Sequence, residues 1–100
     1  MKRKSTIIRK TKETNVLVSL NIDGNGKRKI DTSVGFLNHM LDLFAKHGLF
    51  DLSIKATGDI YIDEHHKVEG IFKATAHAIR MACEIDTRAR KEILSTKGSL

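Results

Sequence analysis

Residues 63–69, with the sequence Asp-Glu-His-His-Lys-Val-Glu, hold the side chains best suited to chemistry. In a helix that begins near Asp63, His65 and Glu69 share one face as an i, i+4 pair, and His66 points about 100° away from His65. The cluster therefore offers ligands in two directions, toward two metal ions or two neighbouring subunits. Neutral imidazole with carboxylate suits manganese, iron, zinc or nickel. The alternative is a solvated helix start whose acidic residues complement the helix dipole.

The chain has 100 residues, 40% of them hydrophobic, which predicts one small domain over residues 1–100. A core of this size is marginal alone, so self-association and metal binding would both stabilise it. Much of the formal charge of +6 lies near the N-terminus, where we expect a basic extension over residues 1–8. One Tyr, four Phe and no Trp do not make an RNA-binding platform, so we expect no nucleic-acid partner. An anionic substrate such as a phosphate ester fits the charge as well.

Cys83 is the single cysteine, and its place on a predicted helix indicates a small buried side chain. The sequence shows no disulfide framework, no signal peptide and no apolar run of membrane length. We therefore expect no membrane association and a reducing, cytoplasmic location.

Alternating apolar and polar residues predict half-buried strands over residues 15–22 and 52–57. The segment Asp-Gly-Asn-Gly at residues 23–26 follows the first of them and predicts a hairpin, with a return strand over residues 27–31. Residues 60–62 predict a fourth short strand that leads into the histidine cluster.

Apolar residues at helical spacing predict helices over residues 35–47 and 64–84. Thr32 or Ser33 is the expected N-cap of the first helix, and Gly48 its C-terminal residue in the left-handed conformation. The expected buried stripes comprise Phe36, Leu37, Met40, Leu41, Leu43 and Phe44 in the first helix, and Val68, Ile71, Phe72, Thr75, Ile79 and Ala82 in the second.

This order of elements predicts an α+β fold, a two-layer sandwich in which two helices cover one face of a four-stranded, mostly antiparallel sheet. His77 is expected on the outer face of the second helix. Residues 86–100 lose periodicity and end in Ser95, Thr96, Lys97 and Gly98. Hydroxyl, amide and ammonium groups together can hold a phosphate, and an unstructured polar end is the alternative.

Six motifs spread along the chain together resemble those of imidazoleglycerol-phosphate dehydratase, the dehydratase of histidine biosynthesis. They are Arg9-Lys-Thr-Lys-Glu13-Thr14, Gly35-Phe-Leu-Asn-His39-Met40-Leu41, His47-Gly-Leu-Phe-Asp51, Gly58-Asp59, His65-His66-x-x-Glu69 and Ser95-Thr96-Lys97-Gly98.

The resemblance implies a manganese enzyme with two metal ions per site, in which Glu13 performs acid–base work on a small phosphorylated imidazole. Its implied metal ligands are His39, His65, His66 and Glu69, and its implied substrate contacts are His47, Lys73, Ser95, Thr96 and Lys97. The family's metal sites lie between subunits of a symmetric homo-oligomer of about twenty-four full-length chains. His39 and His66 would come from one copy, and His65 and Glu69 from another.

Members of this family are about twice as long and consist of two similar halves. This chain resembles one half-repeat joined across the repeated His-His-x-x-Glu motif, without the segment that carries two phosphate-binding arginines. We interpret it as a half-length, engineered or ancestor-like form that converts imidazoleglycerol phosphate to imidazoleacetol phosphate weakly or not at all. The alternative is a non-catalytic, metal-stapled homo-oligomeric module of the same fold.

Overall fold

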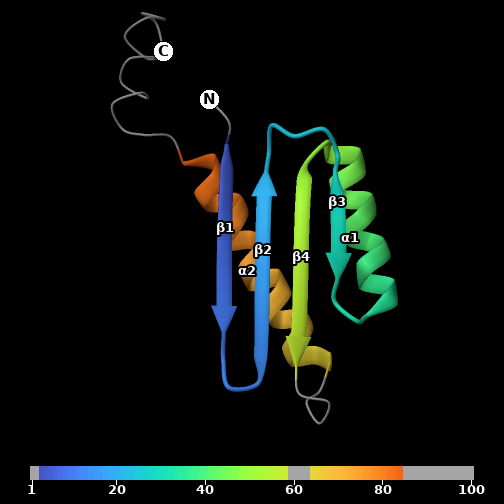
Figure 1. The fold of residues 1–100 in the computed structure, drawn as a ribbon, viewed down its shortest axis with the longest axis vertical. Coiled ribbons are helices and arrows are strands. Elements are labelled where there is room, and N and C mark those ends of the chain that lie inside the picture. The colour runs from blue at the N-terminus through green and yellow to red at the C-terminus, as the bar shows by residue number, and fades with distance from the viewer. Residues whose placement is uncertain (1–2, 59–63, 85–100) are drawn as a thin grey trace, which may run out of the picture.

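The computed structural model describes residues 3–58 and 64–84, which form one sheet with both helices behind it (Figure 1). The elements in chain order are β1 (Lys4–Lys10), β2 (Thr14–Asn21), β3 (Arg28–Asp31), α1 (Gly35–Gly48), β4 (Asp51–Gly58) and α2 (Glu64–Cys83). Helix α2 lies over β1, β2 and β4, and α1 lies over β3. The predicted α+β two-layer architecture is therefore confirmed.

The four strands lie in the order β1-β2-β4-β3 (Figure 1). The β1–β2 and β2–β4 pairs are antiparallel, whereas β3 and β4 are parallel. The predicted hairpin between β2 and β3 is wrong, because β4 lies between them. Asp51 at the start of β4 accepts hydrogen bonds from the backbone N–H groups of Asn25 and Lys27, at 2.8 and 3.0 Å. The Asp-Gly-Asn-Gly segment is thus hydrogen-bonded to the start of β4. The chain passes the end of β4 there and continues into β3 on its far side.

The fourth strand of the sheet is β1, which the sequence pattern does not predict. Residues 4–8 of the expected basic extension over residues 1–8 belong to this strand. Ser5 and Ile7 turn toward the helices, but cationic and hydroxyl side chains surround them and obscure the alternation. The strand predicted over residues 60–62 lies outside the described residues.

The core forms between the sheet and the helices. Strands β2 and β4 contribute the predicted alternating residues Val16, Val18, Leu20, Leu52, Ile54 and Ala56. Helix α2 contributes Ile71 and three alanines, at positions 74, 78 and 82, and their small side chains let its axis approach the sheet. Phe72 lies about 100° around the helix from Ile71 and is 56% exposed, so its predicted burial is wrong.

Helix α1 buries a narrower stripe than the sequence predicts. Leu37, Leu41 and Ala45 face the sheet, while Phe36, Met40 and Phe44 are exposed one position around the helix. The reason is that α1 covers only the short edge strand β3. The buried part of an edge-strand helix is limited by the width of sheet beneath it.

Both predicted caps of α1 are wrong. Val34 occupies the N-cap position without a side-chain hydrogen bond, and Thr32 instead accepts from the Val34 N–H and donates to Asn38. At the other end Leu49 adopts the left-handed conformation with φ 57°. Gly48 is needed for another reason, since a Cβ there would lie 2.5 Å from the Phe50 ring.

No helix within residues 3–58 and 64–84 has the length and apolar character needed to cross a membrane.

Candidate functional site

Glu13 lies in the turn that joins β1 to β2. The Thr11 hydroxyl accepts hydrogen bonds from the backbone N–H groups of Glu13 and Thr14, at 3.2 and 3.0 Å. A threonine side chain that bonds the backbone two and three residues later stabilises such a turn. Figure 1 shows this turn at the same lower end of the molecule as the start of α2.

The first turns of α2 are held against the sheet and against the approach to α1. The Lys67 ammonium donates to the Ser33 hydroxyl at 2.7 Å, immediately before α1 begins. At Gly70 the helix lies close to β2, since an added Cβ would be 3.5 Å from Val16 and 3.8 Å from Thr14. These contacts bring the histidine cluster to the end of the sheet where Glu13 lies.

A hollow of about 280 Å³, here called the turn–helix hollow, lies between the β1–β2 turn and α2. Four of the predicted site residues share it: Glu13, His66, Glu69 and Lys73. Glu13 and His66 are more than fifty residues apart in the sequence. The remaining lining residues are Arg9, Thr11, Lys12, Thr14 and Gly70.

The charge of the turn–helix hollow is shaped by an ion pair within α2. The Lys73 ammonium lies 2.7 Å from the Glu69 carboxylate, an i, i+4 pair on the exposed helix surface. The hydrogen bond from Lys73 lowers the pKa of Glu69, and the charges of Lys73, His66 and Arg9 act in the same direction. Glu69 is therefore ionised at neutral pH, the state in which a carboxylate binds metal.

The predicted metal ligands do not meet within one chain. His66 and Glu69 line the turn–helix hollow, whereas His39 lies on the exposed surface of α1 and His65 on the first turn of α2, both outside its lining. In the part of the chain that the structure describes, no three His, Cys, Asp or Glu side chains form a metal-binding group. Imidazole and carboxylate suit manganese chemically, and within the described residues His66 and Glu69 are the predicted ligands that line the hollow.

Of the remaining predicted substrate contacts, His47 is described and does not line the turn–helix hollow. His47 is in the last turn of α1, far along the helix from the approach held by Lys67. Ser95, Thr96 and Lys97 lie outside the described residues. Arg9 and Lys12, by contrast, line the turn–helix hollow although neither is a predicted site residue. The signal for Arg9 is its place near the end of β1, on the face that Ser5 and Ile7 turn toward the helices.

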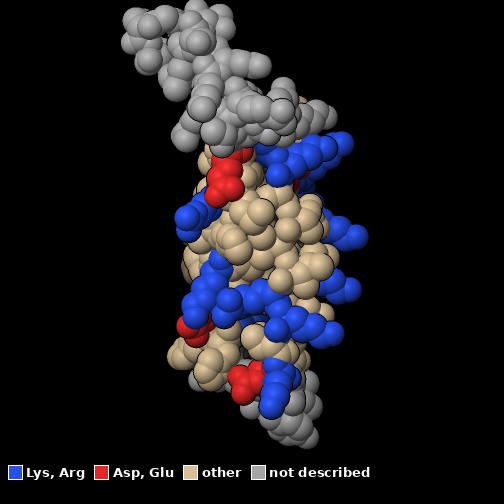
Figure 2. All heavy atoms as spheres, turned by 90° about the vertical axis from the view of Figure 1, so that its left-hand side faces the viewer, with Lys and Arg blue, Asp and Glu red and all other residues tan. Residues whose placement is uncertain are grey.

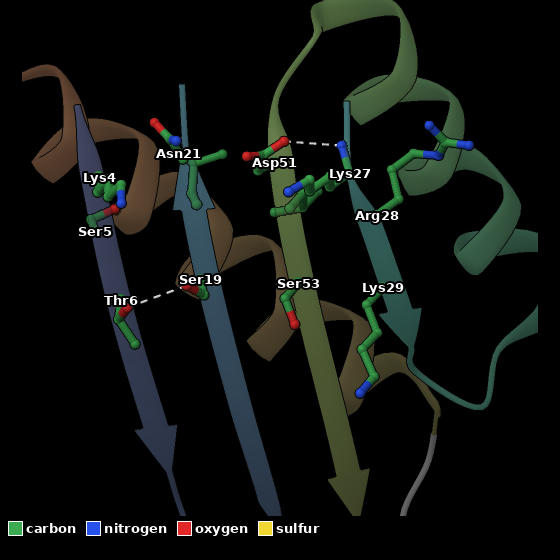
Figure 3. Close-up of a pocket in the computed structure, with 12 residues that line it drawn as sticks. Lys4, Ser5, Thr6, Ser19, Asn21, Lys27, Arg28, Lys29, Asp51 and Ser53 are labelled. Carbon is green, nitrogen blue, oxygen red and sulfur yellow. Dashed lines mark hydrogen bonds between the residues drawn. The ribbon is translucent and has the colours of Figure 1, made fainter. Parts of the chain in front are cut away.

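A larger hollow of about 590 Å³ lies on the open face of the sheet (Figure 3). Figure 3 shows Ser19 and Ser53 near its centre, with lysines on the outer strands. Its one carboxylate, Asp51, already accepts backbone hydrogen bonds, which lower its pKa. This surface has cations and hydroxyls but neither an imidazole nor an available carboxylate, so we place the candidate functional site in the smaller hollow.

Comparison with known proteins shows what the chain is similar to. The family model described as imidazoleglycerol-phosphate dehydratase matches residues 32–93. Among curated relatives, the imidazoleglycerol-phosphate dehydratase of Geobacter sulfurreducens is 60% identical over 82 residues, which is 82% of this chain and 42% of the relative. That of Acetivibrio thermocellus is 56% identical over the same shares. That of Sulfurimonas denitrificans is 67% identical over 63 residues, 63% of this chain and 33% of the relative.

The chain spans less than half the length of these relatives. The matched region of the family model includes α1, β4 and α2, and so contains the histidine cluster. A match over most of the chain, together with identities well above 30%, identifies its ancestry: the chain belongs to the imidazoleglycerol-phosphate dehydratase family.

Proposed function

We propose that this chain is a half-length, manganese-dependent dehydratase for a small phosphorylated imidazole, with sites that are completed when copies of the chain assemble. The observation that carries the proposal is the turn–helix hollow, in which Glu13 faces the same space as His66, Glu69 and Lys73. A carboxylate for proton transfer, metal-type donors and a cation for an anionic group are thereby combined.

Glu13 would act as the proton-transfer group. Dehydration removes a proton from one carbon and a hydroxide from its neighbour, so a base must stand beside the C–H bond. Glu13 is exposed in a turn that Thr11 holds in shape, which leaves its carboxylate accessible to a bound molecule. Lys73 would attract the negatively charged part of the substrate.

His39, His65, His66 and Glu69 would hold the metal, with ligands shared between copies. Bound manganese would supply Lewis-acid polarisation of the substrate's imidazole. The absence of a three-ligand group within residues 3–58 and 64–84 supports sharing, because a stable site needs more donors than one described copy brings together. In each shared site His39 and His66 would come from one copy, and His65 and the negatively charged Glu69 from another.

The exposed apolar residues on the helices support assembly. Phe36 is 76% exposed, and Met40, Phe44 and Phe72 are also exposed. Large apolar side chains at such density on a small domain favour burial against a partner. We propose a second copy of this chain as that partner, because shared metal ligands require copies to meet.

We expect turnover to be weak. The family resemblance assigns part of the phosphate anchorage to two arginines in a segment that this chain does not contain. A charged hydrogen bond contributes about 1.5–3 kcal/mol, so two lost contacts would lower affinity by a few powers of ten. The expected consequence is a high KM, because binding energy at the phosphate also positions the reacting carbon.

The test combines assembly, metal content and turnover. Size-exclusion chromatography with light scattering, and metal analysis of the same fractions, should show an oligomer with manganese that dissociates in EDTA. Slow dehydration of imidazoleglycerol phosphate should require manganese and disappear in Glu13→Gln without loss of bound metal. A stable 11.2 kDa monomer without bound metal would refute the proposal. Metal-dependent assembly without any turnover would instead identify the non-catalytic module.

A further inference from the structure

Arg9 occupies an unusual position in the sheet. Side chains alternate along a strand, and in β1 the Ser5 hydroxyl bonds the Ala78 carbonyl of α2 while Ile7 packs on the core. Arg9 is the next residue on that face, opposite the fully buried Val16 of β2. A cation therefore stands where the pattern of the strand would place an apolar side chain.

Arg9 faces the part of α2 that contains a glycine. Gly70 also lines the turn–helix hollow, and a side chain there would project toward Val16 and Thr14. Arg9 and Lys73 line both this hollow and an adjoining one of about 220 Å³. The two cations thus stand together where the hollows meet.

The Arg9 guanidinium is available for a ligand. Lys73 is paired with Glu69, but Arg9 makes no hydrogen bond or ion pair with any other residue in ranges 3–58 and 64–84. Figure 2, viewed from the β1 edge, shows Lys and Arg side chains gathered over this side with few acidic ones. A guanidinium offers several N–H donors in a planar fork that matches the oxygens of phosphate.

We propose that Arg9, with Lys73 beside it, anchors the phosphate group of the substrate at the rim of the turn–helix hollow. The ligand class is a phosphate monoester dianion, whose charge suits two adjacent cations. This inference rests on the proposed function for the identity of the whole substrate. It adds Arg9 as a binding residue, so that cations of this chain itself would bind the phosphate.

The experiment is titration of the full chain with inorganic phosphate and with glycerol 3-phosphate, followed by calorimetry at low salt. Arg9→Ala should weaken both affinities about ten- to a hundredfold, the effect of losing charged hydrogen bonds. The affinities of Arg9→Lys should lie between those of the wild type and those of Arg9→Ala, since lysine keeps the charge and loses the planar fork of donors. Lys10→Ala is the matched control, because Lys10 is the neighbouring cation on the opposite face of β1 and its loss changes net charge equally.

Three outcomes would overturn the proposal: wild-type chain that binds neither phosphate, Arg9→Ala with unchanged affinity, or equal losses in Arg9→Ala and Lys10→Ala. Circular dichroism of each variant establishes that it is folded, and Arg9→Lys provides a conservative second test. Manganese content is measured separately in every variant and should not change in Arg9→Ala. A chain that binds phosphate through Arg9 but holds no manganese would refute the proposed function alone, so the two failures are distinguishable.

Discussion

Individual side chains along α2 point in different directions and therefore contact different surroundings. Glu69 points to Lys73 and is kept ionised by it, and both line the turn–helix hollow with His66. His77 lies two turns further along, is exposed, and lines the adjoining hollow rather than the turn–helix hollow. The metal-binding role proposed for this helix therefore belongs to its first turns.

Replacing His66 or Glu69 with alanine should weaken manganese binding by at least about tenfold, since even residues that only support metal ligands contribute 10–100-fold. His77→Ala is the control on the same helix and should leave the affinity unchanged. Equilibrium dialysis with manganese gives the comparison. Equal affinity in all three variants would show that the cluster does not bind metal.

A second residue-scale prediction concerns Asp23, which pairs with Arg3 at 2.9 Å and joins the start of β1 to the loop after β2. Hydrogen bonds from Arg3 lower the pKa of Asp23 to about 2. A lowered pKa means that the stabilising effect is complete above the unfolded value of roughly 3.9 and is lost as the pH falls toward 2. The Tm of Asp23→Asn should therefore lie slightly below that of the wild type at pH 6.

The two Tm curves should approach each other as the pH falls through about 2 and converge below it, where the wild-type carboxyl is itself protonated. A constant difference across this pH range would show that the ion pair is not the source of the effect. Because both side chains are exposed, we expect the difference to be small.

At the scale of elements, the connection from β3 to α1 depends on one buried side chain. Thr32 is fully buried, and the Asn38 side-chain oxygen accepts from both its backbone N–H, at 2.9 Å, and its hydroxyl. Asn38 is in the first turns of α1, so these bonds orient the helix on the strand that it covers. This orientation in turn directs His39 to the exposed surface.

Asn38→Ala should destabilise the chain by about 1–3 kcal/mol, because two buried donors of Thr32 would lose their acceptor. Asn38→Asp keeps an acceptor oxygen in the same place and should cost less. Urea denaturation of the two variants measures the difference. If alanine and aspartate proved equivalent, the Thr32 hydrogen bonds would not be what holds the helix.

At the scale of the whole molecule, the two faces of the sheet differ in what they offer a partner. The open face is rich in lysine and hydroxyl side chains around the larger hollow, while the helices expose large apolar side chains such as Phe36 and Met40. Burial of apolar surface drives most protein association. We therefore expect copies to meet through the helices.

Phe36→Ser should shift the oligomer toward monomer at a given concentration, with little effect on the stability of the monomer, since Phe36 is mostly exposed. Leu17→Ser is the control on the open face of the sheet, where Leu17 is 40% exposed, and should leave assembly unchanged. Analytical ultracentrifugation of the manganese-bound chain is the measurement. Dissociation by Leu17→Ser but not by Phe36→Ser would place the contact on the sheet instead.

The sequence alone determines the elements whose signals are local. The alternation of Val16, Val18 and Leu20 predicts β2, and helical spacing predicts α1 and α2 with their bounds nearly as observed. Each of these elements buries one face, and the period of its apolar residues records that burial directly. The motifs around Glu13 and His66 likewise identify the family, which the comparisons confirm.

Only the tertiary structure decides which elements are neighbours. Hydrogen bonds from the Asp-Gly-Asn-Gly segment to Asp51 place β3 beyond β4, and a local turn signal does not contain that information. Nor does periodicity show that the narrow support under α1 leaves Phe36 exposed. The hollow that unites Glu13 and His66 arises from packing between segments far apart in the chain, and Arg9 acquires its place beside them through the same non-local contacts.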